Sequence, residues 1–296
     1  MSTPSLPGFG IKPIPQRQWP TGLSREDLFD VLLVWKPPKK GHRYVLSADI
    51  ADGIGQDRSV GDVYDVGTIE YPDEQVAQFI TSGLDPVGFA GVLDAIGNFY
   101  VDDDSEPALC AIENNNHGLA CQTHLQHHWG YNNLFIWQSL DKRNPRARYS
   151  NSFGWVTNVR TRPIILTYLH RALHTKDEQT GVRDVIINSP HTIAEMLDFE
   201  APPEGQLWQA EAIAGAHDDC IMCAAIGLWV CQTLRFDENE PMAEARRRRA
   251  EEQALKLASS GGAEADKINT DWTGDEIVAE VQDDWNSEGG ARSWPW

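Results

Sequence analysis

The chain has 296 residues, 41% of them hydrophobic, and a formal net charge of −19 at pH 7. This length suffices for one large domain or two small ones, and the charge argues against a protein that grips DNA through bulk positive charge. The sequence has no apolar run long enough to predict a membrane span. Its N-terminus lacks the basic stretch followed by an apolar stretch that would predict a signal peptide. Its five cysteines show no regular spacing, which indicates a reducing compartment.

The first 40 residues are rich in proline, as in PSLPGFGIKPIPQ and WKPPKK. Proline removes backbone donors and favours extended chain, so residues 1–40 are predicted to be an irregular arm or linker. Between the proline clusters, SREDLFDVLLVW predicts a short helix with Ser24 as its N-cap.

Residues 41–236 are predicted to form one compact α/β domain. Apolar or alternating runs predict strands, and the alternation in SVGDVYDVGTIEY is typical of a half-buried one; the predicted strands are 43–49, 59–71, 74–82, 107–115, 133–137 and 207–213. Helical spacing predicts helices at 86–101, 118–129, 161–175 and 189–199, the last two with caps at Thr161 and Ser189. The segment 219–235 is apolar nearly all round, which is typical of a buried helix.

From residue 237 the composition changes. This segment holds 15 acidic and 7 basic residues, a net charge of −8, and the first 236 residues carry −11. A helix is predicted at 241–258, where acids flank the run Arg246–Arg249, and the rest is predicted to be a largely disordered acidic tail. Because the body is acidic too, nucleic acid must be contacted through a local basic patch.

The best such patch lies in DKRNPRARYSN and just after it. Its members are Lys142, Arg143, Arg146, Arg148, Arg160 and Arg162. A local cluster of this kind can neutralise phosphates, so we expect it to contact the DNA backbone. The alternative is a solvated loop.

Acidic residues stand at the ends of two predicted strands and at the start of the buried helix. Asp49 ends the first strand of the domain, Glu113 ends a middle strand, and Asp218 and Asp219 precede the apolar run CIMCAAIGLW. Parallel strands of an α/β sheet place their carboxyl ends along one edge, where sites form. The helix could bring its aspartates to that edge; alternatively, the two aspartates simply cap the helix, where the dipole favours negative charge.

Clustered carboxylates repel one another, and burial would protonate them unless a cation relieves the repulsion. Ligand sets made of oxygen alone favour Mg²⁺ or Mn²⁺ over Zn²⁺. Two such ions about 3.5–4 Å apart would suit in-line phosphoryl transfer. Cys220 and Cys223 form a CxxC, but within a buried helix they are expected to be small apolar residues. The His124, His127 and His128 cluster is expected on a half-exposed helix face.

The sequence resembles the nuclease domain of the large terminase subunit of tailed bacteriophages, which belongs to the ribonuclease H-like superfamily. The matching stretches are YVLSADIADGIGQDRSVGDVYDV, AIENNNHG, SNSFGWVTNVRTRPIILTYLHRAL, HTIAEMLDFE and AIAGAHDDCIMCAAIGLW, in that order and across roughly residues 43–235. The resemblance implies a ribonuclease H-like mixed central sheet flanked by helices.

The resemblance also implies roles for the acids. Asp49 matches the first catalytic aspartate, Glu113 the second acid, and Asp219 with Asp218 the closing metal-binding pair. Asp57 corresponds to an auxiliary acid after a glycine-rich turn that contains Gly53 and Gly55. Two other polar residues near the site each have two interpretations. His217 either contacts an acid or a phosphate, or has a structural role. Asp52 is either an extra acid of the site or a solvated turn residue.

The function so implied is a metal-dependent endonuclease that cuts concatemeric double-stranded DNA during phage genome packaging in the host cytoplasm. No GxxxxGK[ST] sequence occurs, so the packaging ATPase is expected to be a separate chain or a further domain. Portal protein and a small terminase subunit are the other expected partners, and no association with a membrane is expected. A junction resolvase or transposase-type nuclease, and a non-catalytic packaging component that binds portal or ATPase, remain alternatives.

Overall fold

The structure is a computed structural model that describes residues 10–13, 28–53, 57–68, 71–139, 150–174, 184–200, 211–212 and 217–238. Its centre is a seven-stranded sheet in the order β1-β2-β5-β4-β3-β6, with β9 pairing β5 as well. The strands are β1 (Gly10–Pro13), β2 (Val31–Val34), β3 (Tyr44–Asp49), β4 (Ser59–Asp65), β5 (Asp73–Thr81), β6 (Leu109–Ile112) and β9 (Val185–Ile186).

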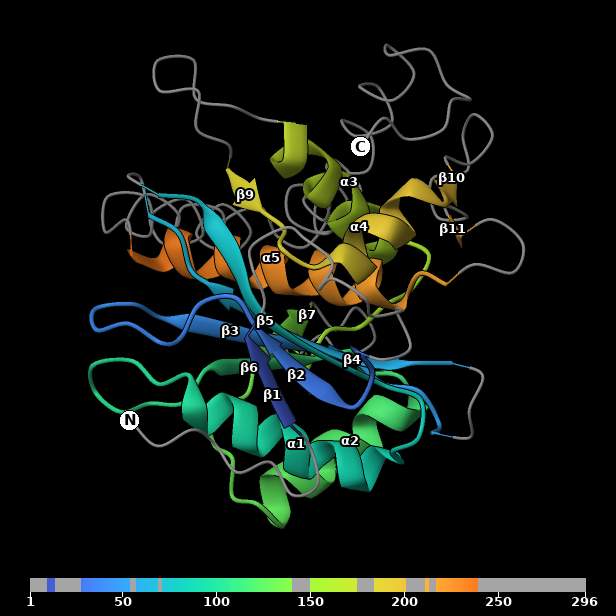
Figure 1. Cartoon of the computed structure of the whole chain (residues 1–296). Coiled ribbons are helices and arrows are strands. Elements are labelled where there is room, and N and C mark those ends of the chain that lie inside the picture. The colour runs from blue at the N-terminus through green and yellow to red at the C-terminus, as the bar shows by residue number, and fades with distance from the viewer. Residues whose placement is uncertain are drawn as a thin grey trace, which may run out of the picture.

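Helices cover both faces of this sheet (Figure 1). One face carries α1 (Pro86–Phe99) and α2 (Asn116–His127), and the other carries α5 (Asp219–Glu238), beyond which lie α3 (Thr161–His174) and α4 (Pro190–Leu197). Two short antiparallel pairs complete the described part, β7 (Ile136–Ser139) with β8 (Ser150–Phe153) and β10 (Phe199–Glu200) with β11 (Glu211–Ala212).

The core is divided by the sheet into two layers. Leu46, Val63 and Phe89 belong to the layer beneath α1 and α2, whereas Val45, Tyr64 and the apolar residues of α5 belong to the other. As a result every residue of β4 is buried. The expectation of a half-buried strand was therefore wrong, because polar residues such as Asp62 point into a covered face rather than into water.

The connections identify the fold class. Strands β3, β4 and β5 form an antiparallel meander, and the chain then passes through α1 to β6, which pairs in parallel with the opposite side of β3. This is the predicted mixed central sheet flanked by helices, and the α/β class is confirmed. The arrangement places the carboxyl ends of β3 and β6 at the same edge.

The described part of the N-terminal segment does not form an irregular arm. β2 pairs antiparallel with β5, and β1 pairs parallel with β2, so both extend the central sheet. The predicted helix in SREDLFDVLLVW is also wrong for its second half, because Val31–Val34 is a strand whose Leu32 and Leu33 are buried. The division of the chain at residues 40 and 236 stays a prediction; α5 itself continues to Glu238.

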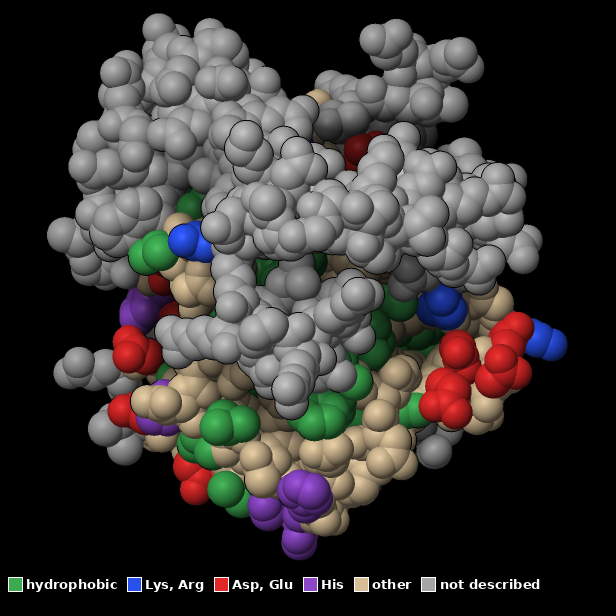
Figure 2. Space-filling view, turned by 180° about the vertical axis from the view of Figure 1, so that it is seen from behind, with side chains coloured by type: hydrophobic (Ala, Val, Ile, Leu, Met, Phe, Trp, Pro, Cys, Tyr) green, Lys and Arg blue, Asp and Glu red, His purple; other side chains and the backbone are tan. Residues whose placement is uncertain are grey.

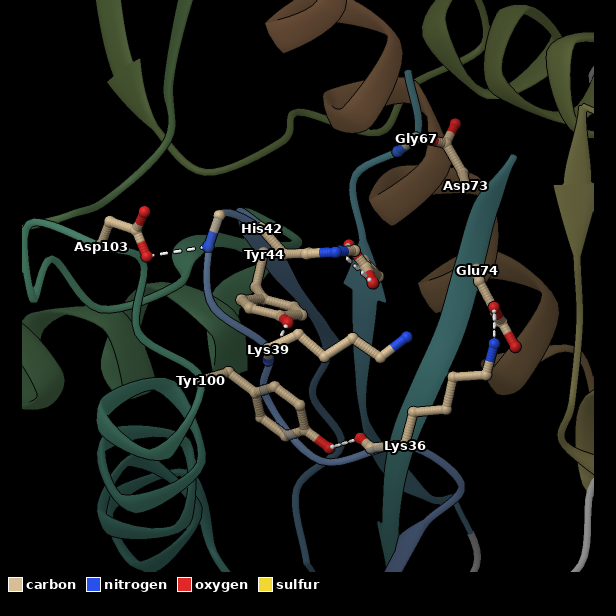
Figure 3. A network of polar contacts seen from close by, with 11 residues as sticks. Lys36, Lys39, His42, Tyr44, Gly67, Asp73, Glu74, Tyr100 and Asp103 are labelled. Atoms are coloured by element: carbon tan, nitrogen blue, oxygen red, sulfur yellow. Dashed lines mark hydrogen bonds and ion pairs between the residues drawn. The ribbon is translucent and has the colours of Figure 1, made fainter. Parts of the chain in front are cut away.

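A network of polar contacts fixes the proline-containing connection from β2 to β3 (Figure 3). The Tyr100 hydroxyl donates to the Lys36 carbonyl at 2.8 Å, and the Lys39 amide donates to the Tyr44 hydroxyl at 2.8 Å. Lys36 also forms an ion pair with Glu74 on β5. Non-local partners thus order a segment whose own sequence predicts only extended chain.

Helix starts follow the expected capping chemistry with one exception. The Ser189 hydroxyl accepts from the amides of His191 and Thr192, as predicted for the start of α4. At α3 the side chain of Asn158 accepts from Arg160 and Thr161 instead of Thr161 acting as the cap. The predicted helix at 241–258 and the acidic tail lie outside the described residues.

Among the described residues, no helix is long and apolar enough to cross a membrane.

Helix α5 approaches the sheet closely at Gly227. A Cβ atom there would lie 2.6 Å from Ser47 Oγ and 2.7 Å from Tyr64 Cε2, both buried in strands. We expect Gly227→Ala to destabilise the protein by about 1–3 kcal/mol, because overpacking exceeds the gain in helix propensity. Urea denaturation would measure this, with the exposed Gly83→Ala as control, where no neighbouring atom lies within 4 Å. Equal stability of the two variants would contradict the packing argument.

Candidate metal centre

Two of the predicted acids lie side by side at the edge of the sheet. Asp49 is the last residue of β3, and Glu113 directly follows β6, its parallel neighbour. The Glu113 amide donates to the Ala48 carbonyl at 2.8 Å, which extends the pairing to the acids themselves. The expectation that the two acids stand on adjacent parallel strands is met, and their metal-binding roles stay predictions.

The start of α5 brings two further carboxylates towards this pair. Burial raises the pKa of Asp49 well above its usual value, and the Glu113 carboxyl, which hydrogen-bonds to it, raises the pKa further. The charges of Asp219 and Asp218 add smaller contributions in the same direction. The four acids therefore belong to one electrostatic group, in which full ionisation is unfavourable.

The Asp219 carboxylate has a buried oxygen that few neighbouring groups stabilise. Its Oδ2 is buried and accepts no hydrogen bond from the described residues. His217 Nδ1 lies 3.4 Å away, within ion-pair reach but without hydrogen-bond geometry. Burial, followed by the charges of Asp218 and Asp57, raises the pKa of Asp219 to about 7. A buried carboxylate oxygen that accepts no hydrogen bond is what a cation would stabilise.

Asp218 differs from Asp219 because it already has a cationic partner. Arg162 Nη2 lies 2.5 Å from Asp218 Oδ2. Burial raises the pKa of Asp218, and the Arg162 guanidinium opposes that shift. Arg162, which was predicted to contact the DNA backbone, thus forms an ion pair with one of the clustered acids. Because Asp218 already has this partner, Asp219 is the better candidate for a direct metal ligand.

The structure also decides against helix capping as the role of the two aspartates. The amides of Cys220 and Ile221, the second and third residues of α5, donate to Oε2 of Glu195 at 2.8 and 3.4 Å. These are the donors that an N-cap side chain normally satisfies. Since Glu195 on α4 accepts them, the Asp218 carboxylate is left to pair with Arg162, and the Asp219 carboxylate is left to face the other acids.

The backbone around Glu113 is built from close approaches that need glycine. A Cβ on Gly118 would lie 1.8 Å from the Glu113 carbonyl oxygen, and one on Gly154, whose φ is +73°, would lie 2.2 Å from the Ile112 carbonyl oxygen. Trp155 then pairs with the strand end, its amide donating to Ile112 at 2.8 Å. The Asn115 amide group donates to Glu113 Oε2 at 2.9 Å and fixes the orientation of that carboxylate.

The remaining predicted site residues are placed less centrally. Asp57 is exposed, and its charge acts on Asp219 and His217. Burial lowers the pKa of His217, and the nearby Arg58 lowers it further. Asp52 is half-buried. Gly53 has a φ of +79°, and a Cβ there would lie 2.4 Å from the Leu84 carbonyl oxygen. Gly55 lies outside the described residues.

The basic patch can be followed only at one end. Arg160 is exposed, and Lys142, Arg143, Arg146 and Arg148 lie outside the described residues. On the face seen in Figure 2, Lys and Arg side chains are scattered singly among acidic ones. The described surface in that view thus offers no broad basic footprint, and the expectation of a local patch in residues 142–148 stays a prediction.

Two other groups of potential ligands have structural explanations. Cys220 and Cys223 are fully buried in α5, where Cys223 Sγ lies 3.4 Å from the Ser47 carbonyl oxygen. His124 and His128 stack with ring centroids 4.4 Å apart on the exposed side of α2, as predicted for a half-exposed face. A group of His side chains is visible at the lower end of Figure 2.

The acids fit a hard divalent cation by the chemistry of their donors. Within the described ranges, no group of three or more His, Cys, Asp or Glu side chains is placed so that it could hold a metal ion. The fit rests instead on carboxylate-only donors, which Mg²⁺ and Mn²⁺ prefer, and on the buried Asp219 Oδ2, which accepts no hydrogen bond. Asp49, Glu113 and Asp219 stay the predicted ligands of such an ion.

Sequence reasoning missed two residues next to these acids. Glu195 lies within HTIAEMLDFE as a lone acid in an apolar helix, and that isolation was the available signal. Arg58 Nη1 lies 3.5 Å from Glu195 Oε1, and the Arg58 guanidinium also covers the Phe29 ring at 5.1 Å. Nothing local in the sequence connects Arg58 with Glu195, because they are brought together only by the fold.

No protein-family model and no curated protein matches the sequence. Among solved structures, the chain is similar to the large terminase nuclease from the thermophilic phage G20c. The crystal structure with bound magnesium is 17% identical over 72% of this chain and 89% of that chain, with a TM-score of 0.46. The structure with bound cobalt has 17% identity, the same coverage and a TM-score of 0.47. A further structure of that nuclease has 16% identity over 73% and 91%, with a TM-score of 0.45.

Proposed function

We propose that the chain is the metal-dependent endonuclease of a phage DNA-packaging terminase, acting on concatemeric double-stranded DNA with two Mg²⁺ or Mn²⁺ ions. The observation that carries this proposal is the convergence of Asp49, Glu113 and Asp219 at one edge of the sheet, with a buried oxygen on Asp219 that accepts no hydrogen bond. The ordered sequence motifs that resemble terminase nucleases support the same function.

Asp49, Glu113 and Asp219 would hold the ions, and bound ions would supply an activated water and stabilise the leaving oxygen. The chain itself prepares the ligands. Asn115 orients Glu113 through its hydrogen bond to Oε2, and burial of Asp49 raises its pKa, so that a bound cation would favour the charged form. Protons held by the crowded carboxyls would be released when the ions bind, so the affinity for metal should rise with pH.

DNA would approach from the side of Arg160 and of the segment 142–148, whose cations would neutralise backbone phosphates. Contacts to the backbone position DNA without reading bases, so we expect little sequence preference. Residues 142–148 are thus proposed to orient the strand, and Arg162 to serve both Asp218 and the incoming phosphate. The proposed setting is the host cytoplasm. The proposed partners there are a packaging ATPase, either a separate chain or a further domain, the portal and a small terminase subunit.

Cleavage of supercoiled plasmid tests the function. The protein should nick and linearise plasmid with Mg²⁺ or Mn²⁺ and lose this activity in excess chelator, because the proposed chemistry needs the ions. A strong preference for four-way junctions over linear duplex would instead favour the resolvase-type alternative. Folded protein that cuts no DNA yet binds a portal or packaging ATPase tightly would favour the non-catalytic packaging component.

A further inference from the structure

The first turn of α5 has an unusual source of capping. A helix leaves its first amides without partners, and the residue before the helix normally satisfies one of them with its own side chain. Asp218 occupies that position, and its carbonyl accepts the Met222 amide at 2.9 Å as the first helical bond. Its carboxylate, however, is paired with Arg162 instead.

The capping acceptor comes from another helix. Glu195 is 5% exposed and lies on α4, where its Oε2 accepts from the amides of Cys220 and Ile221. Arg58 Nη1 lies 3.5 Å from the other carboxylate oxygen, Oε1, as an ion pair without a hydrogen bond. The amide of Cys220 directly follows Asp219, so the bond to Glu195 fixes the backbone from which the Asp219 side chain projects.

We infer that Glu195 is a positioning residue of the metal centre: it caps α5 in place of Asp218, and so leaves Asp218 to pair with Arg162 and Asp219 to face Asp49 and Glu113. Without Glu195, the Asp218 carboxylate at the N-cap position would be the acceptor for the unsatisfied amides. That carboxylate would have to leave Arg162 to cap the helix, and the start of α5 would shift with it. The inference rests on the proposed function, since it concerns the same site.

The cap itself can be tested without metal or DNA. Hydrogen exchange of the Cys220 and Ile221 amides in the metal-free protein should accelerate in Glu195→Ala and stay as in the wild type in Asp218→Ala. Glu195→Gln keeps an oxygen that can accept these bonds and should restore most of the protection. Faster exchange in Asp218→Ala, with unchanged exchange in Glu195→Ala, would overturn the capping assignment.

The consequence for the site is tested by calorimetric titration with Mn²⁺. Glu195→Ala should weaken Mn²⁺ binding by about 10- to 100-fold, the range seen when residues that orient metal ligands are removed, and Glu195→Gln should recover most of the affinity. The matched control is Asp85→Ala, which removes the acceptor of the Gly88 amide at the start of α1, on the face of the sheet opposite α5. It should lower the melting temperature but leave Mn²⁺ affinity unchanged.

The outcomes separate the inference from the function on which it rests. Wild-type Mn²⁺ affinity in Glu195→Ala would overturn the positioning role and leave the nuclease proposal standing. Equal loss of affinity in Glu195→Ala and Asp85→Ala would also overturn it, since general destabilisation would then explain both. Absence of Mn²⁺ binding and of cleavage in the wild type would reject the proposed function, and the positioning role with it.

Discussion

Asp49→Asn is expected to reduce metal-dependent plasmid cleavage by on the order of 10³-fold or more, as losses of essential groups in other hydrolases do. Asparagine has nearly the same size but supplies one neutral oxygen in place of a charged carboxylate. The charges of Glu113, Asp219 and Asp218 all act on Asp49, which is expected to lie at the centre of the acid group. Another acid could take over its role as a metal ligand only by changing position. Single-turnover cleavage at saturating Mn²⁺ measures the effect.

Asp62→Asn is the matched control for this experiment. Asp62 is also a fully buried carboxyl of the same sheet, and burial raises its pKa to about 7. Its partners are Tyr64, Gln75 and Gln78 rather than the acids at the strand ends. Cleavage should survive in Asp62→Asn and be lost in both Asp49→Asn and Glu113→Gln. If Asp49→Asn and Glu113→Gln still cut DNA, the active site lies elsewhere.

Asp219→Asn should stabilise the metal-free protein at pH 8 by about 1–3 kcal/mol, although it removes a proposed ligand. The pKa of Asp219 is raised to about 7 in the folded protein, from about 4 in the unfolded chain. The folded state therefore binds the proton more tightly. The contribution of this group to stability is fully present below about pH 4 and is lost as the pH rises through about 7.

Urea denaturation at pH 6 and pH 8, in chelator and in Mn²⁺, tests this prediction. In chelator the advantage of the variant should be larger at pH 8 than at pH 6. In Mn²⁺ at about 100 times the dissociation constant, the wild type should gain about 2.7 kcal/mol, whereas the variant should gain much less. Exposed Asp104→Asn serves as control and should change neither quantity. A variant that is less stable than the wild type in chelator at pH 8 would contradict the electrostatic account.

The sequence carried enough information for the centre of the sheet and for two of the acids. The runs that form β3 and β6 are apolar and end in single carboxylates, so both the strands and the expected edge could be read locally. Helix α5 was equally clear, because its apolar surface on all sides fits only a buried helix.

Features that depend on distant partners could not be read in this way. Val31–Val34 becomes a strand because β5, more than 40 residues later, offers it an edge, while its own flanking residues suggest helix or arm. The distinction between Asp218 and Asp219 depends on Arg162, which the Asn158 turn aims at Asp218. The role of Glu195 depends on how α4 is placed against α5. Each of these needs tertiary structure that neighbouring residues do not encode.

The pairing of α5 with β3 has a consequence for how the protein matures. Cys223 and Ser47 touch across 176 positions of sequence, so this contact closes a very long loop and must form late in folding. During synthesis, before α5 has emerged from the ribosome, the chain already contains Asp49 and Glu113 but not yet Asp219 at the start of α5. A metal centre divided in this way would stay incomplete until nearly all of the described chain has been made, so the proposed nuclease would not cut DNA before its synthesis is almost finished.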